Sequence, residues 1–127
     1  MAKMIPDTVI DKGLEDIAKN GDRLYLCNAQ PSLYSSLASY SLGYATLTTG
    51  VPGGSFTIGD GDTSGRKVSV AEKDVTATKT DTCNHIAVAD SVNELLKAVT
   101  TVSGFSTVSG DDVTVKAFDL WEIRDPA

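Results

Sequence analysis

The sequence predicts a mainly β protein: an antiparallel β-sandwich or jelly roll with one N-terminal α-helix and a long ordered loop segment. Apolar residues recur at helical spacing near the N-terminus, at Ile10, Leu14 and Ile17. From residue 66 onward, short runs alternate apolar with polar residues, as strands with one buried face do. Turns rich in Gly and Asp separate these runs, which is typical of antiparallel sandwiches.

The N-terminal helix has predicted ends and one apolar face. Asp7 is expected to cap its first turn, and Asn20-Gly21 to end it in a left-handed conformation. Its single apolar stripe must pack against the chain's own sheet or against a neighbouring subunit. Both alternatives stay open at this point.

A first strand is predicted over residues 23–28, where closely spaced apolar residues indicate burial on both faces. The stretch from Leu24 to Gly65 then contains no Lys or Arg, and its only charges are Asp60 and Asp62. Low charge combined with Tyr is typical of the core of a protein–protein interface. The stretch is therefore either an ordered loop over the chain's own core or a surface for another subunit. If both this stretch and the helix stripe contact another subunit, the predicted contact residues are Ile10, Leu14, Ile17, Leu33, Tyr34, Leu37, Tyr40, Leu42 and Tyr44.

Beyond Gly65 every periodic segment is predicted to be a strand. The expected strands lie around residues 68–70, 75–77, 86–88, 95–99 and 105–108, and a last one runs from 113 to 123. Part-way along this last strand, the apolar residues switch from one face to the other. This predicts either a bulge near Asp119 or a strand that is buried on both faces.

A chain of 127 residues is long enough for one domain with its own core. We expect a single β-sandwich domain over residues 1–127, with a helical arm (1–21), an uncharged loop-rich segment (29–65) and a β core (66–124). The net charge of −6 repels phosphate backbones and anionic lipid headgroups, so we expect neither nucleic acid nor a membrane as a partner. No signal-peptide pattern opens the sequence, so assembly in the cytoplasm is expected.

Residues suited to catalysis are scarce. His85 is the only histidine, and on a regular strand it would share a face with Cys83. No third or fourth ligand near this pair supports a metal site. Cys27 and Cys83 are expected to be buried free thiols. We therefore predict no catalytic residue, no cofactor and no enzymatic activity.

The loop over residues 59–65 is a weak candidate for calcium. Asp60, Asp62 and Ser64 stand at alternate positions, as oxygen ligands do at the start of a calcium-binding loop. The Glu that such a loop needs at its twelfth position is absent, because Ala71 stands there. Gly and Asp also favour tight turns, so a turn between two strands is the alternative.

Six stretches follow one another in a characteristic order, at residues 24–27, 30–31, 34–43, 59–67, 85–90 and 117–126. In this order they resemble a family of small tailed-bacteriophage virion proteins, usually encoded near the major capsid gene. The order is more specific than any one stretch, since each alone is a common turn or strand.

The resemblance implies a head decoration (cementing) protein with a β-sandwich or jelly-roll fold. Such a protein binds the outside of the capsid, bridges subunits of the major capsid protein and stabilises the shell by binding only the assembled state. It implies a virion location on the capsid exterior, after assembly in the host cytoplasm. A homo-oligomer is expected, with a dimer favoured over a trimer.

Two other functions remain open. A carbohydrate- or receptor-binding jelly roll needs an exposed aromatic platform, for which Tyr40, Tyr44 and Trp121 are the candidates. A tail or neck component of the same virion would be present in a few copies per particle, whereas a head decoration protein would be present in hundreds.

Overall fold

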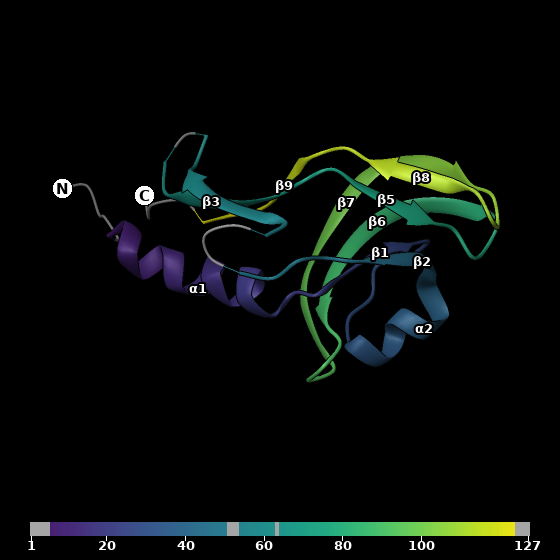
Figure 1. Ribbon diagram of the computed structural model, residues 1–127, viewed down its shortest axis with the longest axis horizontal. Coiled ribbons are helices and arrows are strands. Elements are labelled where there is room, and N and C mark those ends of the chain that lie inside the picture. The colour runs from purple at the N-terminus through teal and green to yellow at the C-terminus, as the bar shows by residue number, and fades with distance from the viewer. Residues whose placement is uncertain (1–5, 51–53, 63, 124–127) are drawn as a thin grey trace.

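Antiparallel β-sheets make up most of the computed structural model, which describes residues 6–50, 54–62 and 64–123 (Figure 1). The predicted mainly β fold with antiparallel sheets and an N-terminal helix is confirmed. The elements are α1 (Asp7–Asn20), β1 (Arg23–Cys27), η1 (Tyr34–Ser36), α2 (Leu37–Tyr40), β2 (Ser41–Thr46), β3 (Phe56–Asp60), β4 (Arg66–Val70), β5 (Lys73–Thr76), β6 (Asp81–Asp90), β7 (Leu95–Thr107), β8 (Asp112–Val115) and β9 (Phe118–Ile123).

The strands of the described residues form three separate sheets. The largest has the order β2-β1-β6-β7, the second has the order β3-β4-β9, and the third pairs β5 with β8. One core joins them, because Leu24 of the first sheet, Val68 of the second and Val75 of the third are all fully buried in a single apolar cluster. In Figure 1, α1, β3 and β9 lie at one end of the molecule, and the long curved strands β6 and β7 reach toward β5 and β8 at the other.

Helix α1 packs against the chain's own sheets. Ile10, Leu14 and Ile17 lie on its buried face within the main core, and the helix contacts β3 and β4. This decides between the two alternatives for the apolar stripe in favour of the chain's own sheet. It also corrects the expectation that these three residues contact a partner, because their side chains are already buried inside the folded chain. Residues 1–5 of the expected arm lie outside the described residues.

Both predicted helix ends need correction. Pro6 precedes the helix and no side chain caps it; Asp7 is instead the first helical residue, where its negative charge favours the helix dipole. Gly21 has φ −75° and ψ 90°, which is extended rather than left-handed. A glycine is needed at position 21 for close packing, because an added Cβ would lie 2.6 Å from Cγ1 of Val88.

The uncharged segment is less loop-like than predicted. Besides η1 and α2 it contains strands β2 and β3, which the polar and Gly-rich sequence obscured. Gly43 in β2 has φ 145°, and an added Cβ would lie 2.5 Å from the carbonyl oxygen of Thr76. Gly43, which in the sequence suggests a loop, therefore allows β2 and β5 to approach each other closely. Residues 51–53 of the expected loop lie outside the described residues.

The C-terminal half contains the expected strands with different boundaries. The two strands predicted over residues 95–99 and 105–108 are one long strand, β7, whose pairing with β6 shifts register between Cys83 and His85. The single strand predicted over residues 113–123 is divided into β8 and β9, which belong to different sheets. The bulge predicted near Asp119 is confirmed, because the pairing of β9 with β4 skips Leu120.

Replacing Leu14 tests whether α1 belongs to the core. Leu14→Ala removes a fully buried side chain, so we expect the free energy of unfolding to fall by about 2–5 kcal/mol. Val9 on the same helix is 60% exposed, so Val9→Ala should change it by no more than about 0.5 kcal/mol. Urea unfolding followed by circular dichroism measures both. Equal stability of the two variants would contradict this placement of the helix.

Candidate interaction surface

The four-stranded sheet carries a second apolar cluster on the face turned away from the main core. Tyr25 and Cys27 of β1, Ala87 and Ala89 of β6, and Leu37 of α2 form its buried part. The short segments η1 and α2 lie over this face (Figure 1). The central strands are therefore covered on both sides, as the dense apolar sequence of β1 predicted.

An aromatic patch borders this cluster. We define it as Arg23, Tyr25, Tyr34 and Tyr44, together with Leu33, which directly precedes Tyr34 in the chain. Tyr25 and Tyr44 pair directly across β1 and β2, and their ring centroids are 5.4 Å apart. The guanidinium carbon of Arg23 lies 4.4 Å from the centroid of the Tyr44 ring, within the range of a cation–π interaction.

Two members of the patch are open to solvent. Leu33 is 64% exposed and Tyr44 is 47% exposed, whereas Tyr34 is half-buried. A hollow of about 270 Å³ lies between Tyr25, Tyr34 and Leu37, with Ser35, Ala38 and Ser41 completing its wall. The neighbouring Tyr25 hydroxyl raises the pKa of Tyr34, so this phenol is neutral at physiological pH. The patch thus presents apolar surface and neutral hydroxyl groups, and Arg23 is its only charged member.

The structure divides the contact residues predicted within the uncharged segment. Leu33 and Tyr44 are exposed in the patch, and Tyr34 and Tyr40 pack at the margin of the second cluster. Leu37 and Leu42 are buried, and Leu42 belongs to the main core.

Sequence reasoning missed Arg23 as a member of the patch and the buried Tyr25 ring that supports it. The signal was present, because residues two apart on a strand share a face and Tyr25 lies two residues after Arg23. What the sequence did not show was the register that places Tyr44 beside them.

The three rings proposed as a carbohydrate platform do not gather on one surface. Tyr44 lies on β2, at one edge of the four-stranded sheet. Trp121 is 50% exposed beside Ile17 and Lys97, next to β7 at the opposite edge. Tyr40 packs against the second cluster.

The candidate calcium loop forms the turn between β3 and β4. Asp60 Oδ1 accepts a hydrogen bond from Arg66 Nη1 at 2.8 Å, and Asp62 Oδ1 accepts one from Lys67 Nζ at 2.8 Å. Arg66 and Lys67 are consecutive on β4 and point to opposite faces, so they draw the two carboxylates apart. Within the described residues, which include Ser64, no group of three or more His, Cys, Asp or Glu could hold a metal ion.

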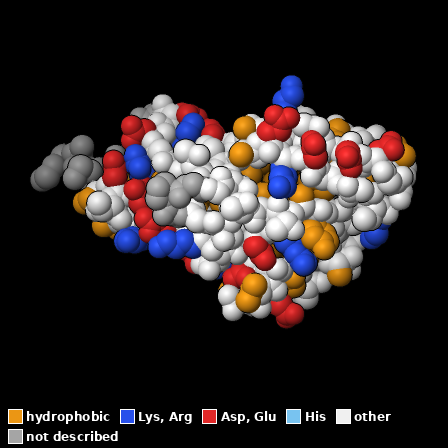
Figure 2. All heavy atoms as spheres, in the orientation of Figure 1, with side chains coloured by type: hydrophobic (Ala, Val, Ile, Leu, Met, Phe, Trp, Pro, Cys, Tyr) orange, Lys and Arg blue, Asp and Glu red, His pale blue; other side chains and the backbone are white. Residues whose placement is uncertain are grey.

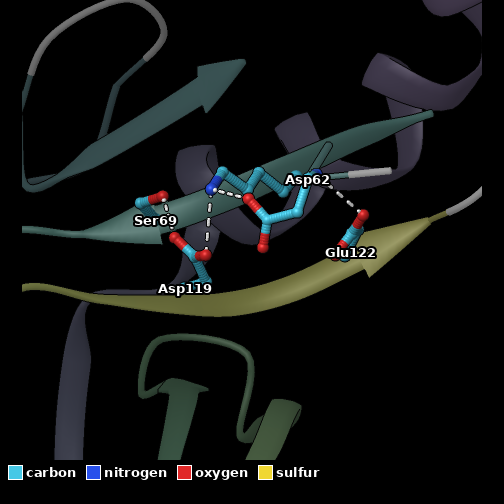
Figure 3. A network of polar contacts seen from close by, with 5 residues as sticks. Asp62, Ser69, Asp119 and Glu122 are labelled. Atoms are coloured by element: carbon cyan, nitrogen blue, oxygen red, sulfur yellow. Dashed lines mark hydrogen bonds and ion pairs between the residues drawn. The ribbon is translucent and has the colours of Figure 1, made fainter. Parts of the chain in front are cut away.

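A polar network ties this turn to β9 (Figure 3). Lys67 Nζ also donates to Asp119 Oδ2 at 2.9 Å, and the backbone N–H of Asp62 donates to Glu122 Oε1 at 3.1 Å. Ser69 Oγ donates to Asp119 Oδ1 at 2.9 Å. Lys67 and then Ser69 lower the pKa of Asp119. The residues of this motif therefore join the turn to its neighbouring strand.

Cys27 and His85 lie opposite each other on β1 and β6, but they lack the signature of a nucleophilic pair. Burial raises the pKa of Cys27 to about 12, whereas a reactive cysteine beside an imidazolium has a lowered pKa. Nδ1 of His85 lies 2.7 Å from Oδ1 of Asn84. Cys83 packs in the main core with Ile86, so the predicted shared face of Cys83 and His85 is wrong. The register shift between them turns Cys83 to the other side.

Several hydrogen bonds hold the turn between β6 and β7, and this turn carries an exposed aliphatic side chain. Asp90 Oδ1 accepts hydrogen bonds from the backbone N–H groups of Val92 at 3.0 Å and Asn93 at 3.1 Å. Its Oδ2 accepts one from the Asn93 amide, and Asp22 Oδ1 accepts one from the Ser91 backbone N–H, both at 2.8 Å. The Val92 side chain is nevertheless 82% exposed.

Comparisons with protein-family models, curated proteins and solved structures found no match for this chain. Among the helices of the described residues, none combines the length and the apolar character needed to cross a membrane.

Acid should weaken the β6–β7 turn through Asp90. The Asn93 side chain and then its backbone N–H lower the pKa of Asp90, so folding favours the carboxylate. Its stabilising contribution is complete above about pH 4, the usual range of Asp, and is lost as the pH falls through the lowered pKa of the folded state. Asp90→Asn should therefore be less stable than the wild type at neutral pH, and this difference should shrink in acid.

Urea unfolding between about pH 7 and about pH 2 measures this effect. Asp111→Asn is the control, because the Asp111 side chain makes no hydrogen bond or ion pair within the described part of the chain. It should keep the pH dependence of the wild type. A difference between wild type and Asp90→Asn that stays constant with pH would refute the role of the carboxylate.

Proposed function

We propose that this protein is a structural component of a tailed-phage virion that binds the outside of the capsid and stabilises it by bridging major capsid subunits. The observation that carries the proposal is the aromatic patch. Tyr and Arg are enriched where proteins bind proteins. Tyr44 is exposed on β2, the edge strand of the four-stranded sheet, and Leu33 is exposed just before η1. The sequence resemblance supplies the kind of partner.

A preformed patch suits a cementing role. Tyr44 is oriented by Tyr25 and Arg23 before any partner arrives, so less side-chain freedom is lost on binding. A protein that binds only the assembled shell stabilises that shell by linkage, and it needs neither a deep pocket nor a reactive group. The finer fold class, a β-sandwich of jelly-roll type, belongs to the same proposal, supported by the packing of all three sheets on one core.

The double variant Leu33→Asp/Tyr44→Asp tests the patch. Each substitution places a charge on an exposed apolar position, so the fold should persist while affinity for the shell falls by about tenfold or more. Co-sedimentation with purified capsids that lack this protein measures the affinity, and circular dichroism checks the fold. Tyr34 and Tyr40 are less suitable, because both pack against the second cluster.

Val9→Asp is the matched control. It adds a charge at a side chain that is 60% exposed, in the first turn of α1 at the far end of the molecule (Figure 1). Negative charge is favourable at a helix N-terminus, so this variant should fold and bind like the wild type. Binding of the double variant at the wild-type level would refute the patch, and failure of the wild type to bind capsids would refute the proposed function.

Two alternatives are separated by other measurements. A tail or neck component would be present in a few copies per purified particle, which quantitative mass spectrometry distinguishes from a head protein. A glycan-binding protein would bind on a glycan array and lose that binding when Tyr44 or Trp121, both about half exposed, is replaced by Ala.

A further inference from the structure

A second feature of the surface is an apolar groove between β7 and the connection from β8 to β9. Val102 and Phe105 of β7 form one wall, and Val115, Ala117 and Phe118 form the other. Its volume is about 260 Å³, and the exposed Lys116 stands at its rim. An apolar cavity of about 150 Å³ already accommodates benzene, so the groove has room for an aliphatic side chain.

The same chain carries a projection that fits such a groove. The β6–β7 turn presents Val92, 82% exposed, and next to it Glu94, an exposed acidic residue in the left-handed region at φ 57°. Hydrogen bonds to Asp90 and Asp22 hold the turn in one conformation, so little freedom is lost when Val92 is buried. Figure 2 shows hydrophobic and acidic atoms together at the edge of the molecule where Figure 1 places this turn.

Charge favours a second copy of this chain as the occupant. Glu94 and Lys116 form no ion pair within the described residues, and they have opposite signs. Each stands beside one of the two apolar features, so seating Val92 in the groove of a neighbour brings the two charges together. Exposed ion pairs contribute little affinity, but they fix orientation and disfavour wrong partners.

We propose that copies of this protein associate head to tail, with Val92 of one copy seated in the groove of the next. In Figure 1 the β6–β7 turn and the β8–β9 connection, which lines the groove, lie on opposite sides of the molecule, so one copy can use both at once. Such a heterologous contact builds rings or open chains rather than a two-fold dimer. The inference concerns contacts between copies and does not depend on the aromatic patch or on a capsid.

The contact is small, and the net charge of −6 opposes association of free copies. We expect a Kd on the order of 0.1–1 mM for the free protein, as for interfaces at the low end of the size range. On a surface that holds copies close together, the effective concentration would raise occupancy.

Two variants that each destroy one half of the contact test the inference. Val92→Asp places a charge on the projecting turn and leaves the groove intact. Ala117→Asp places a charge at an exposed position of the groove and leaves the turn intact. Sedimentation velocity over a concentration series up to about 1 mM should show self-association of the wild type and at least tenfold weaker association of each variant.

Mixing the two variants distinguishes a head-to-tail contact from a two-fold one. The intact turn of Ala117→Asp can still enter the intact groove of Val92→Asp, so the mixture should form dimers and nothing larger. Charge exchange adds a second check: Glu94→Lys should weaken association, and Glu94→Lys/Lys116→Glu should restore it.

Val108→Asp is the control, because Val108 is a 51% exposed valine at the β7–β8 turn. It should associate like the wild type. A wild type that remains monomeric throughout the series would overturn the inference, as would a mixture that forms no dimer. If Val92→Asp lost capsid binding while the wild type stayed monomeric, the turn would instead contact the shell. Failure of the proposed function leaves these results unchanged, since no capsid is used in the association measurements.

Discussion

The antiparallel pairing of β1 with β6 is the interaction on which the other features depend. Leu24 and Leu26 of β1 face the main core, and Tyr25 and Cys27 face the second cluster, so every side chain after Arg23 is buried. Strand β6 is buried in the same way from Ile86 to Asp90. Backbone hydrogen bonds removed from water on both faces resist local opening. This strand pair therefore forms a rigid centre that supports the surface features on either side.

Each surface feature is an extension of that centre. The aromatic patch lies over the N-terminal end of β1, where the Tyr25 ring packs beside Tyr44 of the neighbouring strand β2. The projecting turn continues β6 directly, and Asp22, just before β1, accepts the hydrogen bond of Ser91 that helps to hold it. The groove uses the far part of β7, which pairs with β6. Surfaces supported by rigid elements keep their shape between the free and bound states, which suits a protein that acts by binding other proteins.

The acidic charge of the chain is spread between structural and exposed roles. Asp119 and Asp62 hold Lys67, Asp11 and Asp60 hold Arg66, and Asp90 closes a turn. Each of these carboxylates has a partner within the chain, and in the loop over residues 59–65 such pairs hold the turn between β3 and β4. The positions that carry the proposals are instead apolar and exposed, where burial on binding yields the largest gain in free energy.

The sequence by itself determined the mainly β, antiparallel class with an N-terminal helix, the helix stripe of Ile10, Leu14 and Ile17, and the burial of β1 on both faces. It also placed a break in alternation near Asp119, with a bulge as one of two explanations. These follow from local periodicity, which a single chain displays directly. Only the tertiary structure decided which layer covers which. It buried the helix stripe in the chain's own core, separated β8 from β9, and divided the uncharged segment into strands, buried leucines and an exposed patch. Strand register and packing between distant segments set those outcomes, and both depend on pairings such as Tyr25 with Tyr44 that no local pattern contains.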